Sequence, residues 1–177
     1  MADALSGMRL LLAAVMPWLL ARGGMLPLAV WCVAAASDYI DGPVARRRGT
    51  QRLRGAVLDT VADVTFVLSG LTTAAALGLV SWVTPASIVL SAGTYAVASV
   101  SSRRTGAAPA LARSRLGHWA GVMNYLCLGV VASAVAEPAI RWDSFLTIAA
   151  ATTTLLNIAA VVTRVGGRLA GTGKRRS

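Results

Sequence analysis

Six apolar runs dominate the chain, and each is close to the ~20 residues that an α-helix needs to cross the hydrocarbon core of a bilayer. They cover residues 5–20, 25–41, 57–79, 83–100, 118–135 and 145–162. Hydrophobic residues make up 56% of the chain, which agrees with this pattern. We therefore expect an all-α integral membrane bundle of six transmembrane helices, forming one domain over residues 1–177.

Basic residues separate these runs and set the expected orientation. The chain carries 17 basic and 7 acidic residues, for a net charge of +10. Fifteen of the basic residues fall on one side of the expected bundle: Arg9 and those within 46–54, 103–115 and the tail 164–177. The positive-inside rule therefore places both termini, both basic connectors and this tail in the cytoplasm.

The position of these charges also indicates the kind of partner. A basic protein can bind nucleic acid, but here the charges lie between long apolar runs, so we expect an anionic membrane surface and phosphate-bearing substrates and no nucleic acid. Trp18, Trp82 and Trp142 fall at the predicted outer ends, as an aromatic belt would. Cys32 and Cys127 lie within apolar runs, and we interpret them as packing residues without a disulfide.

Four of the seven acidic residues lie within the 26 positions of residues 38–63. Asp38 and Asp41 are three positions apart and Asp59 and Asp63 four, so each pair shares one helix face at about 5–6 Å. Carboxylates are costly near lipid. If the second and third runs form neighbouring antiparallel helices, the four anions converge and need counter-charge. Such oxygen ligands favour Mg²⁺ or Mn²⁺ over Ca²⁺, and zinc is disfavoured without Cys or His. The structural alternative is helix-end carboxylates paired with connector arginines.

The same segment contains eight residues at fixed spacing: Asp38-x2-Asp41-Gly42-x2-Ala45-Arg46-x8-Gly55-x3-Asp59-x3-Asp63. This motif resembles the signature of the CDP-alcohol phosphotransferase (CDP-alcohol phosphatidyltransferase) family, and the compact six-span chain resembles the phosphatidylglycerophosphate synthases. The resemblance implies a metal-dependent membrane enzyme of phospholipid biosynthesis. It would transfer a phosphatidyl group from CDP-diacylglycerol to a small alcohol, whose hydroxyl attacks the lipid-bearing phosphorus while CMP leaves.

The resemblance also implies roles for the motif residues. Two Mg²⁺ or Mn²⁺ ions would stabilise the attacking and leaving oxygens, held by Asp38, Asp41 and Asp59. Asp63 would be the general base and could also contact the second metal. Glycines allow close backbone approach, and an arginine fork suits phosphate oxygens. The residues implied for the CDP moiety are Asp38, Asp41, Gly42, Ala45, Arg46 and Gly55.

Three positions depart from the family pattern. The first helix lacks the usual Pro-Asn but keeps a hydroxyl and an arginine in Ser6 and Arg9, which either contact the donor or serve as a helix N-cap and a positive-inside arginine. Pro43 disfavours helical geometry at the residue before it, so we expect a bend just after Asp41. Gly117-His118 replaces the Gly-Lys of many members that use phosphorylated acceptors, and we interpret His118 as an interfacial polar residue.

Acceptor recognition depends on a second basic cluster, on the expected cytoplasmic side. We expect some of its members to hold an acceptor phosphate, the alternative being plain positive-inside topology: Arg103, Arg104, Arg113 and Arg115. Glycerol 3-phosphate is the first choice of acceptor, and an inositol phosphate, another polar alcohol or a soluble CDP-alcohol donor remains open.

The resemblance further implies a homodimer. The expected setting is the cell (inner or plasma) membrane, with membrane lipids around the bundle and the active site at its cytoplasmic face. Two rival functions belong to other classes. An ion or solute transporter would use intramembrane carboxylates, although repeats and midplane charges are not evident. A non-catalytic scaffold would keep the fold without its chemistry.

Overall fold

The computed structural model describes the backbone of residues 2–48, 53–104 and 115–173, and the side chains of residues 7–37, 59–99 and 115–166. Within these ranges the chain forms six α-helices and no strand. Their bounds are α1 Ala2–Arg22, α2 Leu26–Arg48, α3 Leu53–Ala76, α4 Val83–Arg104, α5 Arg115–Ala136 and α6 Asp143–Gly173. Each helix contains most or all of one apolar run, which confirms the all-α prediction.

Two helical segments are long and apolar enough to cross a membrane, judged by length and composition over the described residues: Arg115–Ala136 and Asp143–Gly166. Shorter apolar stretches occupy Leu26–Ser37 in α2 and Val83–Ser99 in α4. The number of spans and the side on which the termini lie stay predictions.

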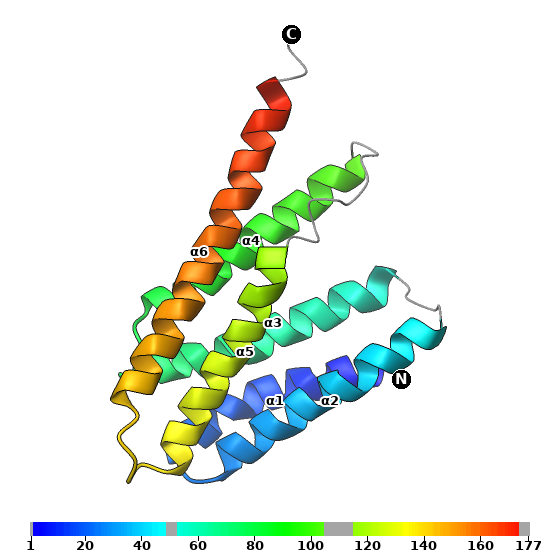
Figure 1. Ribbon diagram of the computed structural model, residues 1–177. Helices are drawn as coiled ribbons and strands as arrows, with labels where there is room; N and C mark the ends of the chain where they lie inside the picture. Colours follow the sequence, from blue (N-terminus) through cyan, green and yellow to red (C-terminus); the bar gives the residue numbers. More distant parts are fainter. Residues whose placement is uncertain (1, 49–52, 105–114, 174–177) are drawn as a thin grey trace.

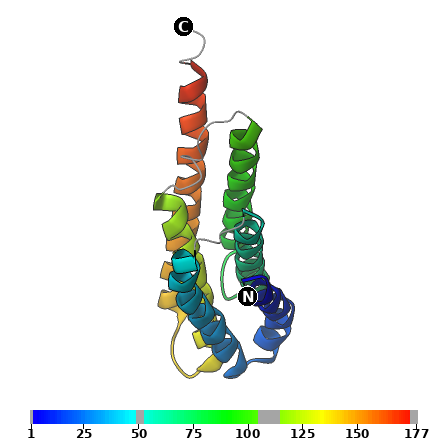
Figure 2. The ribbon, with the colours of Figure 1, turned by 90° about the vertical axis from the view of Figure 1, so that its right-hand side faces the viewer.

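Successive helices run in alternating directions (Figure 1). Figure 2 shows two layers, one of α1, α3 and α4 and the other of α2, α5 and α6, and the layers contact each other through α4 and α6, α1 and α2, and α3 and α5. The most extensive contacts join α1 to α3, α5 to α6 and α4 to α6, and α2 packs on both α1 and α5. Alternation brings the C-terminal ends of α2 and α4 and the N-terminal ends of α3 and α5 toward one end of the bundle, whereas the connectors before α2 and α6 lie at the other.

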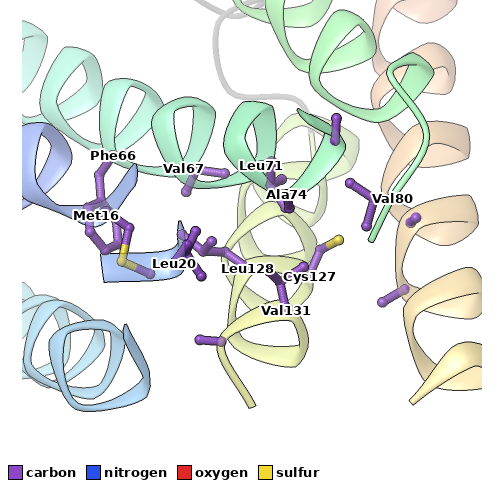
Figure 3. Close-up of a cluster of buried hydrophobic side chains, with 14 of the residues drawn as sticks. Met16, Leu20, Phe66, Val67, Leu71, Ala74, Val80, Cys127, Leu128 and Val131 are labelled. Atoms are coloured by element: carbon purple, nitrogen blue, oxygen red, sulfur yellow. The ribbon is translucent and has the colours of Figure 1, made fainter. Parts of the chain in front are cut away.

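A buried apolar cluster joins α1, α3 and α5 (Figure 3). The labelled side chains come from three helices and the short connector after α3: Met16, Leu20, Phe66, Val67, Leu71, Ala74, Val80, Cys127, Leu128 and Val131. Small residues allow this close packing. A Cβ atom added at Gly70 would lie 2.4 Å from Cδ1 of Leu128, so α3 and α5 approach closely because no side chain separates them.

Large apolar side chains point outward in stripes at seven-residue spacing. Ile148, Leu155 and Val162 on α6 are 65%, 67% and 62% exposed. Val83, Leu90 and Val97 form a similar stripe on α4. Polar side chains are instead buried between helices: Thr84, Ser87, Ser91, Asn124, Thr153 and Asn157. Apolar outside and polar inside is typical of helices that face lipid.

Two helix limits differ from expectation for backbone reasons. α3 stops at Ala76, before the apolar run ends, because Gly78 adopts a φ of 75°. The amide of Leu79 then donates to the carbonyl of Ala74 at 2.9 Å, a Schellman closure that ends the helix. α2, by contrast, is helical past Pro43 to Arg48, so the proline does not end it.

Candidate active site on α1, α2 and α3

The motif residues divide between two consecutive antiparallel helices (Figure 1). Five lie on the C-terminal half of α2 and three on the N-terminal half of α3: Asp38, Asp41, Gly42, Ala45 and Arg46, then Gly55, Asp59 and Asp63. Of their side chains, those of Asp59 and Asp63 lie within the described residues. The predicted convergence of four carboxylates therefore remains a prediction.

The first helix takes a larger part in this region than the motif indicates. α1 makes its most extensive contact with α3 and also packs on α2. Over the described ranges, α2 and α3 do not form a main helix–helix contact with each other. The two halves of the motif are thus held together partly by a third helix.

Arg9 of α1 connects the two motif helices. Its Nη1 donates to Oδ1 of Asp63 in an ion pair, and its Nη2 lies 3.5 Å from Oγ of Ser37, the residue before Asp38. The Ser37 hydroxyl donates to the carbonyl of Ala34 at 2.7 Å, which leaves its lone pairs toward the guanidinium. Arg9 was expected to contact the donor or to mark topology, and the structure places it against the candidate base.

The exposure of the two partners differs. The Arg9 side chain is 5% exposed, whereas that of Asp63 is 36% exposed. A buried guanidinium needs a counter-charge, which Asp63 supplies. Because the carboxylate keeps an open side, it is accessible to a ligand while paired. Asp59, one turn earlier on α3, is half-buried.

The donor set determines which metal would fit. Among the described side chains, no three His, Cys, Asp or Glu residues gather into a potential metal site. Asp59 and Asp63 share a face of α3, so a complete site also requires carboxylates from the end of α2. A set made only of carboxylate oxygens fits Mg²⁺ or Mn²⁺.

Comparison with known protein families identifies the family of this chain. The model of the CDP-alcohol phosphatidyltransferase family matches residues 1–165. The chain belongs to this family. Its members are membrane enzymes that transfer a phosphatidyl group from a CDP-alcohol donor to an acceptor alcohol. No curated protein matched the chain significantly.

The remaining predicted residues of the transferase lie on several helices. Ser6 lies inside α1, which begins at Ala2, so the N-cap alternative is wrong. Arg103 and Arg104 end α4, and their side chains lie outside the described residues, as does all of Arg113. Arg115 begins α5 and is exposed. His118 is also exposed, edge-on to Trp119 with ring centroids 6.1 Å apart.

A second buried arginine was not singled out from the sequence. Arg164 of α6 is 7% exposed, and its Nη1 donates to the carbonyl and hydroxyl of Ser91 at 2.8 and 3.2 Å. It lines a groove of about 360 Å³ between α4 and α6. The apolar run ends at residue 162, so the sequence assigns Arg164 to the basic tail. No local signal identified it, because glycines at 166, 167, 171 and 173 follow Arg164 and disfavour a continuing helix.

Proposed function

We propose that this transferase moves a phosphatidyl group from CDP-diacylglycerol to a small alcohol, with glycerol 3-phosphate the first choice, and releases CMP. The setting is phospholipid synthesis at the cytoplasmic face of the cell membrane. The observation that carries the proposal is the complete family motif, divided between α2 and α3, with a partly exposed Asp63 carboxylate positioned by α1.

The aspartates form the polar centre of the proposed site. When bound, Mg²⁺ or Mn²⁺ would neutralise charge on the donor diphosphate, with Asp38, Asp41, Asp59 and Asp63 as its ligands. Gly42 and Gly55 let the nucleotide approach the backbone, Arg46 pairs with phosphate oxygens, and Ala45 belongs to the same CDP-binding motif.

Asp63 carries the proton transfer. Its carboxylate takes the proton from the acceptor hydroxyl while that oxygen attacks the lipid-bearing phosphorus and the bond to CMP breaks. The ion pair with Arg9 holds the side chain in one orientation, which supports this role. Positioning of the reacting groups is a large part of what such a site contributes.

In this proposal, the arginines at the end of α4 and the start of α5 recognise the acceptor. Helix alternation brings these ends toward the same side of the bundle as the motif (Figure 1). Their guanidinium groups suit a phosphate on the acceptor, as in glycerol 3-phosphate or, as the alternative, an inositol phosphate. We also propose that the protein is a homodimer. Measuring the mass of the protein in lipid nanodiscs would test this oligomeric state.

The experiment supplies purified protein with CDP-diacylglycerol, Mg²⁺ or Mn²⁺ and a panel of alcohols, and measures CMP. Asp63→Asn should lower turnover at least about 100-fold, because the amide cannot accept the proton. Asp143→Asn is the matched control, since Asp143 is exposed at the start of α6 and should leave turnover unchanged.

Two results would contradict the proposal. A transporter or a scaffold would release no CMP with any alcohol, and full activity in Asp63→Asn would refute the role of Asp63 as the base.

Alanine at each of Arg103, Arg104, Arg113 and Arg115 tests the acceptor site separately. An unchanged KM for the acceptor in all four variants would remove the arginine cluster from it.

A further inference from the structure

Arg9 forms an ion pair with Asp63, the carboxylate that the proposed function assigns as a metal ligand. We propose that Arg9 is a built-in counter-cation: its guanidinium neutralises Asp63 before a divalent cation arrives and competes with that cation for the carboxylate. The proposal rests on the proposed function, because it takes Asp63 as a metal ligand. It makes Arg9 a positioning residue that sets how tightly the empty site binds metal.

The contacts of Arg9 describe a group held at the site from two sides. Nη1 donates to Oδ1 of Asp63 on α3, and Nη2 lies 3.5 Å from Oγ of Ser37 on α2. Arg9 as a whole is 4% exposed, so water screens its charge poorly. A carboxylate oxygen engaged by a guanidinium is less available as a metal ligand.

Charge gives the direction of the effect. A divalent cation that binds Asp63 comes close to a buried positive charge that remains attached to α1, and like charges at this range repel. Neutralising Arg9 removes both the repulsion and the competing hydrogen bond. A purely structural ion pair predicts the opposite, because loss of Arg9 would only disorder Asp63 and weaken metal binding.

The experiment measures binding of Mn²⁺ alone, without nucleotide, to the full-length protein in lipid nanodiscs. Free Mn²⁺ is followed by electron paramagnetic resonance. Arg9→Gln should bind Mn²⁺ about tenfold more tightly than the wild type, a modest change for the loss of one nearby charge. Arg9→Lys keeps the charge but cannot bridge Asp63 and Ser37, so its affinity should fall between the two.

Two control variants distinguish a failure of the proposal for Arg9 from a failure of the proposed metal site. Arg22→Gln lies on the same helix at the other end, where the guanidinium stacks 3.9 Å from the Trp18 ring centroid, and should match the wild type. Asp63→Asn should weaken Mn²⁺ binding. Wild-type or weaker affinity in Arg9→Gln would overturn the proposal, while the loss in Asp63→Asn would still support the metal site. If no protein binds Mn²⁺, both proposals fall.

Folding of the neutral variant is checked independently, because losing one partner of a buried pair can destabilise a protein. Should Arg9→Gln not yield folded protein, Arg9→Lys decides the question. Tighter Mn²⁺ binding than the wild type supports competition by Arg9, and equal or weaker binding overturns it.

Discussion

Gly129 of α5 packs against the Trp31 ring of α2. A Cβ atom at this position would lie 2.6 and 2.7 Å from two atoms of the Trp31 ring. The ring cannot move away easily, because its indole N–H donates to the carbonyl of Tyr125 at 2.9 Å. Gly129→Ala should therefore destabilise the protein by about 1–3 kcal/mol, the usual cost of overpacking.

The matched control is on the same helix. Gly121 is exposed, and nothing lies within 4 Å of a Cβ atom built there. Gly121→Ala should be neutral or raise stability by up to about 1 kcal/mol, because alanine favours helix. Thermal unfolding in detergent compares the two variants. Equal stability would show that α2 and α5 can separate without cost at this point.

Single-residue roles could be predicted only where spacing is local. The eight motif residues stand out because their gaps are fixed within one short segment. Arg9 and Asp63 are 54 positions apart, and an arginine near the chain start is equally well explained by membrane topology. Ser37 gave no signal, since a serine in an apolar run is ordinary. Such pairs are created by the packing of α1 against α2 and α3, which no local sequence pattern records.

At the scale of elements, α5 and α6 are joined by buried amides. Nδ2 of Asn157 donates to Oδ1 of Asn124 at 2.7 Å and to the carbonyl of Thr153 at 2.9 Å. Both asparagines are buried, at 1% and 9% exposure. Asn157→Leu should cost about 1–2 kcal/mol, because it leaves the Asn124 amide unsatisfied between helices.

A double substitution tests whether the unsatisfied Asn124 amide causes this loss of stability. Asn124→Leu together with Asn157→Leu replaces both polar groups and should lose less stability than the sum of the single changes. Thr147→Val on α6 is the control, since Thr147 is exposed and donates only to the carbonyl of Asp143 in its own helix. Additive losses, measured by chemical unfolding in detergent micelles, would show that the amide pair does not couple the helices.

Helix number followed from the apolar runs, but helix length did not. Hydropathy reports which residues avoid water, whereas a helix ends where its backbone hydrogen bonding ends. α6 therefore continues eleven residues past Val162 through basic and glycine residues to Gly173, and α3 stops early at the positive φ of Gly78. Pro43 illustrates the same point, because α2 remains helical beyond it to Arg48 although the apolar run ends at residue 41.

For the whole molecule, the alternating helices and the charge pattern together predict one topology in the membrane. Fifteen of the 17 basic residues lie at positions that alternation assigns to one side, and Arg22 and Arg141 lie on the other. The outward apolar stripes of α4 and α6 would then face lipid. The sequence predicts the orientation because it rests on charge counts, which need no knowledge of packing.

Cysteine labelling measures this orientation directly. Cys32 and Cys127 are both free, so they are first replaced by Ser and Ala. Ile140→Cys, in the exposed connector before α6, should react with a membrane-impermeant maleimide in intact cells, whereas Gly173→Cys, at the end of α6, should react only after permeabilisation. Neither change alters a charge. The reverse pattern would place the motif on the outer face, away from cytoplasmic nucleotides, and labelling of both from outside would mean that α6 does not cross the membrane.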